Sequence, residues 1–292
     1  MLFRPMSSYI PAQIIQTGKT RDLPLMARAA VVNVKSLNPE FEYRFFDDAD
    51  VSTFVRKEFP EYQQVFEKFP FRIQKFDFFR YLVVFKLGGF YFDLDVFLAS
   101  GLEALRKHEC VFPFEELTIN RFLRGRYEMD WEIGNYAFGA VPNHPFLEAV
   151  IQNCVRAQRD PAWVKPMMQG IPALFRSEFY VLNTSGPGLL SRTLAENPDL
   201  AKDVTVLFPE DVCDSGTWHQ FGHFGVHAME GSWRVRGSYL RRRLGNLWEV
   251  WVSRRRLRES RRLGKTRAFA GSARINNETA ESAEKRKWAA AI

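Results

Sequence analysis

The chain has 292 residues, of which 46% are hydrophobic and 15% aromatic, and this content excludes an intrinsically disordered protein. Its net charge of +7 is unevenly distributed, because residues 234–263 hold eleven Arg against two Glu while residues 1–233 are net negative. The basic charge therefore belongs to a C-terminal appendage, and no nucleic-acid partner is expected.

The change in composition after Trp233 predicts two parts. Residues 1–233 are expected to form a globular domain, and residues 234–292 a basic amphipathic helical tail with a frayed end. The three cysteines form neither a CxxC pair nor a disulfide framework, which favours a reducing compartment. The N-terminus lacks the basic, apolar and small-residue order of a signal peptide, so we expect none, and no run of about 18 uncharged apolar residues occurs. We therefore expect a cytoplasmic protein that is soluble or peripheral to a membrane.

The first hundred residues alternate between strand and helix patterns. In chain order, these are a strand over 10–18, a helix over 22–37, a strand over 41–46, a helix over 51–59, a helix over 73–87 and a strand over 90–98. The helix over 73–87 is apolar on nearly every side, which predicts burial, and Gly88 and Gly89 supply its left-handed end. This order predicts an α/β fold with a mostly parallel central sheet flanked by helices.

The later elements are shorter. Strands are predicted over 109–113, 135–141 and 204–209, helices over 145–158 and 189–196, and a tight loop over 183–188. Ligands of such sheets bind beyond the carboxyl ends of the strands. We therefore expect the loops over 16–20 and 93–100 to meet at the ligand site.

Asp93 and Asp95 are two positions apart at the end of a predicted strand. If the extended conformation continues through them, both side chains leave one face of the strand. Two converging carboxylates can bind Mg²⁺ or Mn²⁺ and leave coordination sites for the phosphate oxygens of a nucleotide. Such a pair arises by chance on the order of once in a chain of this length, and a solvated strand end is the alternative. The surrounding aromatic and aliphatic residues favour the metal, because carboxylates buried without a cation are costly.

Asp77 and Arg80 lie three positions apart on the preceding helix and therefore share one face of it. A surface ion pair is the simplest explanation of this spacing. The flanking Phe, Tyr and Leu side chains predict burial instead. A buried Asp and Arg beside a nucleotide could bind its ribose and sugar hydroxyls through charge-assisted hydrogen bonds.

These residues belong to a longer pattern. DFFRYL at residues 77–82 and LGGFYFDLDV at residues 87–96 closely resemble the pattern D-xx-R-Y-x-x-L…GG-x-Y-x-D-x-D of glycosyltransferase family 32. These DXD sugar transferases include initiating α-1,6-mannosyltransferases and inositol-phosphorylceramide mannosyltransferases. The catalytic domains of glucosylating clostridial toxins are more distant relatives.

Four further segments are similar to family motifs. The first strand resembles I-P-K-I-I-H-Q-T, with Ile15 in place of the family's His. Residues 135–146 are similar to N…P-x-H-P-F, residues 184–188 to the T-G-P-G loop, and residues 227–233 to the closing H…S-W element. The resemblance thus extends over most of residues 10–233.

The resemblance implies a GT-A type nucleotide-sugar-binding fold and a retaining transfer of a hexose from a nucleotide sugar, with GDP-mannose favoured and a UDP-sugar compatible. It implies that Asp77 and Arg80 bind the ribose and sugar of the donor. It assigns Mn²⁺ or Mg²⁺ to Asp93 and Asp95, with His227 nearby. The implied donor-binding residues are Gln16, Thr17, Asn135, Gly186, Gly188, Ser232 and Trp233. A glycan or glycolipid is the implied acceptor.

Other interpretations stay open. A haloacid dehalogenase-like phosphohydrolase also places D-x-D after an apolar strand, and a non-catalytic carbohydrate-binding or membrane-surface protein could keep the fold without turnover. No catalytic nucleophile is evident, although Asp130 and Glu132 are candidates. Leu and Trp at helical spacing among the arginines of residues 234–263 favour attachment to an anionic membrane surface or, equally, a solvated helix packed on its own domain.

Overall fold

The structure is a computed structural model that describes residues 9–209, 211, 212, 214–228 and 258. The strands are β1 Gln13–Thr17, β2 Glu42–Phe46, β3 Gly89–Phe92, β4 Val96–Leu98, β5 Cys110–Leu117, β6 Trp131–Ile133, β7 Ala137–Ala140, β8 Val204–Leu207 and β9 Gly225–His227. The α-helices are α1 Leu25–Leu37, α2 Asp48–Glu58, α3 Gln63–Lys68, α4 Arg72–Leu87, α5 Arg121–Tyr127, α6 Pro145–Arg159, α7 Pro161–Val164, α8 Arg176–Thr184 and α9 Pro187–Glu196. The predicted boundary at residue 233 and the predicted tail helix, apart from Arg258, lie outside the described residues.

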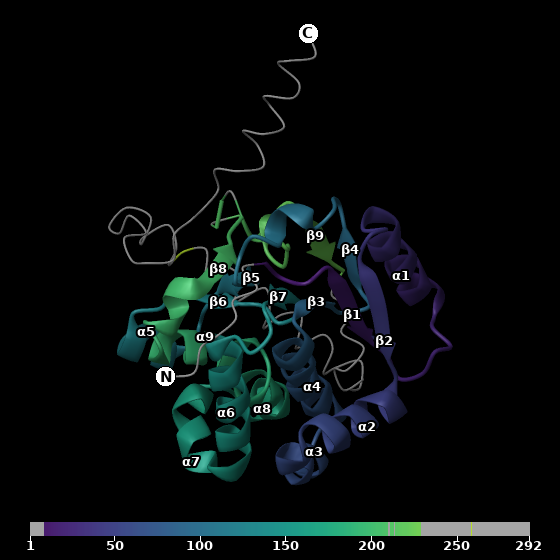
Figure 1. The fold of residues 1–292 in the computed structure, drawn as a ribbon. Helices are drawn as coiled ribbons and strands as arrows, with labels where there is room; N and C mark the ends of the chain where they lie inside the picture. The colour runs from purple at the N-terminus through teal and green to yellow at the C-terminus, as the bar shows by residue number, and fades with distance from the viewer. Residues whose placement is uncertain (1–8, 210, 213, 229–257, 259–292) are drawn as a thin grey trace.

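The main sheet has the strand order β2-β1-β3-β7-β5-β6, and β8 pairs with β5 (Figure 1). The predicted α/β fold with a central sheet flanked by helices is confirmed. The pairs β1–β2, β1–β3 and β5–β8 are parallel, whereas β7 runs antiparallel to both β3 and β5. The sheet is therefore mixed, not mostly parallel. The reason is that β6, which follows β5 after helix α5, returns antiparallel along β5, and the chain continues through residues 134–136 into β7 in the same direction.

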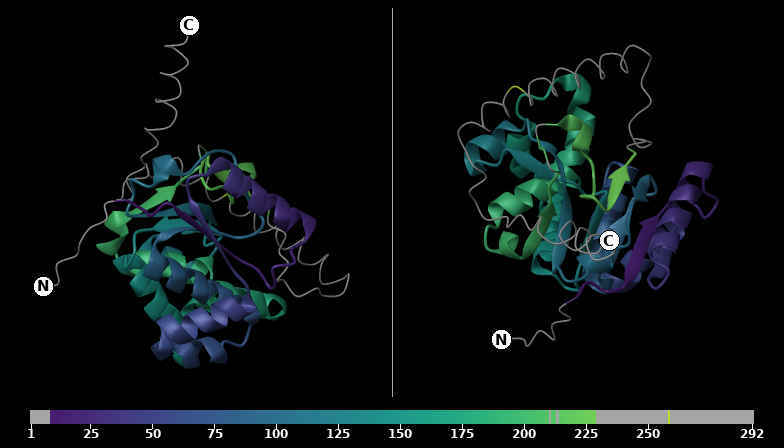
Figure 2. Two further views of the ribbon diagram at one scale, coloured as in Figure 1. Left: turned by 45° about the vertical axis from the view of Figure 1, so that its right-hand side comes forward. Right: turned by 90° about the horizontal axis from the view of Figure 1, so that it is seen from above.

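Two hydrophobic clusters cover the two faces of the sheet. Alternate residues of one strand enter different clusters, so that Ile15 faces the cluster built with α2, α3, α4, α6 and α9, and Ile14 faces the cluster built with α1 and β4. Tyr91 faces the first cluster in the same way, while Phe90 and Phe92 face the second. Figure 2 shows most of the helices on one side of the sheet and α1 on the other.

The end of α4 follows the prediction. Gly88 has φ +70° and Gly89 φ +93°, in the left-handed region that glycine favours. The side-chain amide of Gln13 donates to the backbone oxygens of Leu87 and Gly88 at 2.7 and 3.0 Å. A Cβ on Gly89 would lie 2.3 Å from Cγ of Gln13, so the close contact between this turn and β1 requires glycine.

The predicted strand over 90–98 is two strands. The extended chain ends at Phe92, turns through Leu94 and Asp95, and resumes at Val96 in a separate two-stranded sheet with β9. The amide of Val96 donates to the backbone oxygen of Asp93 at 3.2 Å, which closes the turn. The expected extended conformation through Asp93 and Asp95 is therefore wrong, and a turn sets the direction of both side chains.

Other differences concern short elements. The loop predicted over 183–188 is the junction of two helices, because α8 includes Asn183 and Thr184 and α9 begins at Pro187. The short strands β6 and β9, three residues each, and the helices α3, α5, α7 and α8 were not predicted. Among the described residues, every helix is too short or too polar to cross a lipid bilayer.

Candidate metal and nucleotide site

The turn between β3 and β4 presents two carboxylates at the edge of the main sheet. The amide of Asp93 donates to the backbone oxygen of Tyr136 at 2.8 Å, and the backbone oxygen of Asp95 accepts from the amide of Ala228 at the same distance. Neighbouring chain segments therefore hold both ends of the turn. The side chains of Asp93 and Asp95 are half-buried, with exposed fractions of 27% and 20%.

Strand β9 brings His227 to this turn. His227 pairs with Val96 in the β4–β9 register, and its Nε2 lies 3.3 Å from Oδ1 of Asp95. The imidazole stacks on the ring of Tyr136, with centroids 4.3 Å apart and planes at 17°. One ligand atom from each of Asp93, Asp95 and His227 lies within 4.8 Å of the others. The structure thus brings together the three residues that the sequence nominated for a metal.

The chemistry of these three side chains fits a divalent cation. Carboxylate oxygens suit Mg²⁺ and Mn²⁺, and an imidazole is compatible with the latter. The Nδ1 atom of His227 is buried without a hydrogen-bond partner among the described residues. The role of these three side chains as metal ligands stays a prediction.

Arg80 of α4 is the buried cation of the site, with 3% of its side chain exposed. Its Nη1 donates to Oδ2 of Asp93 at 3.0 Å and to the backbone oxygen of Asn135 at 2.7 Å. Its Nη2 lies 3.2 Å from Oδ1 of Asp77, and the guanidinium lies 4.8 Å from the ring centroid of Tyr91. Because α4 is buried on nearly every side, Arg80 is held between the helix layer and the turn of Asp93.

Burial and the neighbouring charges shift the pKa of the Arg80 guanidinium in opposite directions. Burial would lower the pKa of Arg80, but the carboxylates of Asp93 and Asp77 outweigh it and raise the pKa. Burial raises the pKa of Asp77 and of Asp93, while Arg80 opposes the rise at both. The side chain of Asp93 is 27% exposed and that of Asp77 only 6%, so we expect the effect of burial to be larger at Asp77.

The carboxylate of Asp77 accepts hydrogen bonds from side chains inside the protein. Its Oδ2 accepts from Oγ of Ser185 at 2.7 Å, and its Oδ1 accepts from Nδ2 of Asn135 at 3.1 Å. Asn135 also donates to the hydroxyl of Tyr81 at 3.0 Å. In this arrangement Asp77 orients Arg80 and Asn135. The predicted contact of Asp77 with the donor's ribose stays a prediction.

Gln16 and Thr17 lie beneath the turn at the end of β1. The hydroxyls of Thr17 and Tyr91 lie 2.9 Å apart, and the hydroxyl of Tyr91 donates to Oδ1 of Asp93 at 2.9 Å. The side-chain Nε2 of Gln16 donates to the backbone oxygen of Asp93 at 3.3 Å, and its Oε1 accepts from the hydroxyl of Tyr43 at 3.0 Å. Both residues are buried and support Asp93 from within the sheet.

Gly186 and Gly188 lie at the junction of α8 and α9, where both are buried. A Cβ on Gly188 would lie 2.3 Å from Oδ1 of Asn183, and one on Gly186 would lie 3.0 Å from Cα of Leu182. The glycines thus allow close packing that carries Ser185 to Asp77. Their predicted contact with the donor stays a prediction. Ser232 and Trp233 lie outside the described residues.

Sequence reasoning gave no role to Tyr91, Tyr136 or Ser185. Tyr91 and Ser185 carried a signal, because Tyr91 belongs to the GG-x-Y-x-D-x-D motif and Ser185 stands within residues 184–188, which resemble the T-G-P-G loop. Tyr136 carried none, because its stacking on His227 depends on the β4–β9 pair, which joins segments about 130 positions apart in the chain.

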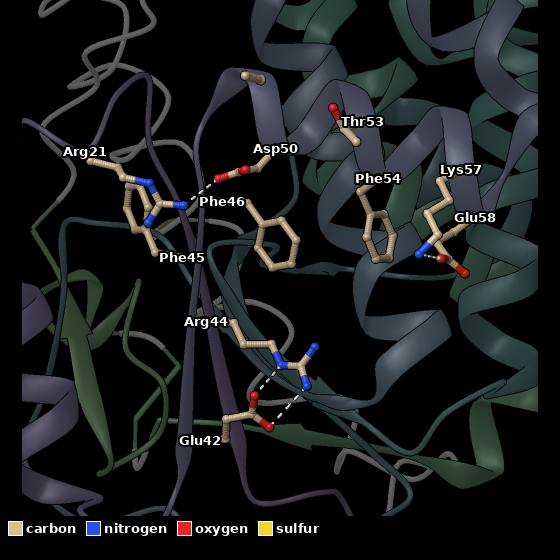
Figure 3. Close-up of a pocket in the computed structure, with 11 residues that line it drawn as sticks. Arg21, Glu42, Arg44, Phe45, Phe46, Asp50, Thr53, Phe54, Lys57 and Glu58 are labelled. Atoms are coloured by element: carbon tan, nitrogen blue, oxygen red, sulfur yellow. Dashed lines mark hydrogen bonds and ion pairs between the residues drawn. The ribbon is translucent and has the colours of Figure 1, made fainter.

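A separate groove of about 600 Å³ lies beside β2 and α2 (Figure 3). Its charged side chains pair with one another. Arg21 lies 2.7 Å from Asp50, Arg44 lies 3.0 Å from Glu42, and Lys57 lies 3.5 Å from Glu58. The groove contains none of the residues of the Asp93 site, and we assign no ligand to it.

Residues 26–112 match the model of the family described as "Glycosyltransferase sugar-binding region containing DXD motif". This range contains Asp77, Arg80, Asp93 and Asp95. The match confirms the resemblance to DXD sugar transferases that the motifs indicate.

Two relatives are inositol phosphoceramide enzymes by name. The chain is 31% identical over 144 residues to inositol phosphoceramide mannosyltransferase 2 of Schizosaccharomyces pombe, covering 49% of this chain and 38% of the relative. It is 27% identical over 187 residues to mannosyl phosphorylinositol ceramide synthase SUR1 of Saccharomyces cerevisiae, covering 64% and 42%. The chain therefore spans about two fifths of the length of these relatives.

Two solved structures are also similar. The PaToxG glycosyltransferase has a TM-score of 0.42 and 15% sequence identity, and the match covers 65% of this chain and 70% of that chain. The UDP-bound glycosyltransferase domain of the YGT toxin has a TM-score of 0.46 and 8% identity, and the match covers 68% of this chain and 80% of that chain. At these TM-scores the similarity carries no functional argument.

Proposed function

We propose that this chain is a glycosyltransferase that needs a divalent metal ion and transfers a hexose, with mannose favoured, from a nucleotide sugar. The observation that carries the proposal is the convergence of Asp93, Asp95 and His227 beside the buried guanidinium of Arg80. The family match over residues 26–112 supports the same chemistry. A GT-A type nucleotide-sugar fold is part of the proposal.

The residues of the chain would act by binding and orientation. Asp93 and Asp95, with His227, would hold Mn²⁺ or Mg²⁺, and the ion would neutralise the charge that develops on the departing nucleotide diphosphate. Arg80 fixes the orientation of Asp93, because the guanidinium and the hydroxyl of Tyr91 each engage one of its oxygens. A carboxylate offers about four acceptor positions, so these contacts leave room for a cation.

The names of the relatives support a mannose donor and a lipid acceptor. Both relatives are named for the mannosylation of inositol phosphoceramide, a ceramide lipid that becomes a glycolipid when the sugar is added. GDP-mannose is accordingly the favoured donor, and a UDP-sugar is the alternative. Membrane attachment through residues 234–263 stays a proposal, since nearly all of this segment lies outside the described residues.

Retention of the anomeric configuration is the stereochemistry that we propose. The carboxylates nominated as nucleophiles are engaged on the β5–β6 hairpin, where Asp130 lies 3.2 Å from Arg124 and Glu132 accepts from the hydroxyl of Thr118. Neither is part of the group around His227. Because both candidate nucleophiles already contact neighbouring side chains, we propose attack of the acceptor from the side of the leaving group and not through a covalent glycosyl-enzyme.

Release of nucleotide from GDP-mannose and UDP-sugars, with Mn²⁺ or with EDTA, tests the proposal on the full chain. We expect Mn²⁺-dependent release from one donor, faster when inositol phosphoceramide in mixed micelles is added. A ligand at about 100 times its dissociation constant adds about 2.7 kcal/mol of stability, so a thermal-shift screen of the same donors identifies the base and sugar independently. Activity on phosphomonoesters alone would instead support a haloacid dehalogenase-like hydrolase.

A further inference from the structure

Helix α1 exposes large apolar side chains to solvent. The exposed fraction is 72% for Leu25, 51% for Met26 and 63% for Val32. The opposite side of the helix is buried through Ala30 and Val34. Large apolar side chains gathered on one exposed helix face mark a surface for interaction more often than scattered ones do.

The exposed face has an ordered charge pattern. Leu25, Ala29, Val32 and Ser36 follow one another at spacings of four, three and four residues, which places them in one row along the helix. Arg28 and Lys35 flank one side of this row, and α1 contains no Asp or Glu. A row that carries Leu25 and Val32 beside basic residues is compatible with a helix that lies in the interface of an anionic lipid bilayer.

The helix is fixed relative to the candidate metal site. The side chain of Asn33 accepts from the amide of Leu98 at 2.6 Å and donates to its backbone oxygen at 3.0 Å, which ties α1 to β4. Strand β4 directly follows Asp95 and pairs with the strand of His227. The views of Figures 1 and 2 agree that α1, β4 and β9 are neighbours. A surface that binds α1 would therefore lie against the layer that carries the site.

We propose that the exposed row of α1 docks on an anionic membrane surface and brings the Asp93 site to a lipid-linked acceptor. The purpose of this docking rests on the proposed function, whereas the docking itself can be measured without turnover. Leu25 and Val32 of the row and Met26 beside it enter the interface, and Arg28 contacts anionic headgroups, whereas the amine of Lys35 lies 5.2 Å from the ring centroid of Tyr43. The charge complementarity argues for a membrane over a second copy of this chain, because two copies would bring like charges of the same face together.

Co-sedimentation of the full chain with phosphatidylserine-containing vesicles tests the docking. Leu25→Ser combined with Val32→Ser is expected to weaken binding about tenfold or more, and Leu174→Ser, an exposed leucine on another element, is the matched control. Phosphatidylcholine vesicles should bind the wild type less well. Equal binding of the double variant and the control would overturn the proposal.

A local probe separates α1 from the C-terminal segment. A solvent-sensitive fluorophore at Val32→Cys, in a Cys213→Ser background, reports on α1 alone because Cys110 and Cys154 are buried. We expect its emission to shift to the blue on addition of phosphatidylserine vesicles, and a probe at Leu174→Cys to stay unchanged. A blue shift that grows with protein concentration in the absence of vesicles would indicate a second copy, and no shift at all would indicate binding through another segment; either contradicts the proposal.

The two proposals can fail separately. Leu25→Ser with Val32→Ser should release nucleotide from the donor at the wild-type rate when no vesicles are present, since neither residue touches the site. Vesicle binding without donor turnover in the wild type would remove the proposed function and leave the docking surface in place.

Discussion

Nη1 of Arg80 lies 3.0 Å from Oδ2 of Asp93, so a buried cation of α4 is held against the first acid of the turn. Replacing Arg80 by Met would leave two carboxylates without their buried partner. We expect the free energy of unfolding to fall by about 3–5 kcal/mol, measured by urea denaturation. Arg56→Met, at an exposed position of α2, should change it by less than about 0.5 kcal/mol. A loss at Arg80 no larger than at Arg56 would show that the pairing contributes nothing.

Asp95→Asn tests the carboxylate that lies beside His227. The amide keeps the shape of the side chain but removes its charge, so the thermal stabilisation by donor in the presence of Mn²⁺ should disappear. Asp199→Asn, whose carboxylate is exposed and pairs with Lys202, is the control and should keep the full shift. Retention of the full shift in Asp95→Asn would count against the metal assignment.

His227→Ala tests the third member of the same group. Loss of an outer-shell partner of a metal typically weakens binding about 10- to 100-fold, and we expect loss of a direct ligand to cost at least as much. Isothermal titration with Mn²⁺ measures the affinity, and His108→Ala, which removes a contact with Thr205, serves as control. Unchanged Mn²⁺ affinity would mean that His227 packs on Tyr136 without binding the ion.

Gly188→Ala tests the packing of α8 on α9. The new Cβ would lie 2.3 Å from Oδ1 of Asn183, and overpacking of this kind costs about 1–3 kcal/mol. Gly125→Ala in α5 is a matched control, because no atom lies within 4 Å of its new Cβ, and Ala in a helix is more favourable than Gly by up to about 1 kcal/mol. Chemical denaturation should therefore give changes of opposite sign. A stabilised Gly188→Ala would show that Asn183 can move aside.

The pH dependence of stability tests the burial of Asp77. Burial raises the pKa of Asp77 above its ordinary value of about 4. Over the interval between these two pKa values the folded state binds more protons than the unfolded state, so this residue's contribution to stability falls as pH rises. Asp77→Asn removes that contribution. The difference in unfolding free energy between wild type and variant, measured without metal from pH 3 upwards, should therefore change with pH above about 4, and a constant difference would contradict the raised pKa.

The sequence predicted the long elements and the charged members of the candidate site, because hydrophobic periodicity and adjacent motifs are local signals. It gave the wrong reason for the convergence of Asp93 and Asp95. Alternation along one strand was expected, whereas a turn between two sheets brings the acids together. The apolar pattern of the sequence could not reveal the turn, since Val96 and Leu98 continue the apolar run of β3.

The contacts of Asp77 with Ser185 and Asn135 could not be predicted from the sequence either. Its i, i+3 neighbour Arg80 was readable from helical spacing. Ser185 and Asn135 reach Asp77 from positions 108 and 58 residues away in the chain, and only the packing of α4 against α8 and the β6–β7 connection places them there. Residues that organise a site from such distances have no periodic signal.

The turn at Leu94 is where the chain leaves the main sheet for the β4–β9 pair, and Asp93 and His227 stand on opposite sides of that junction. An ion held by both would act as a cross-link between two layers that otherwise have separate hydrogen-bond ladders. The rigidity of the smaller layer, and of α1 through Asn33, would then rise as the ion loads. Binding of the ion at the edge of the main sheet would in this way determine the rigidity of β4, β9 and α1.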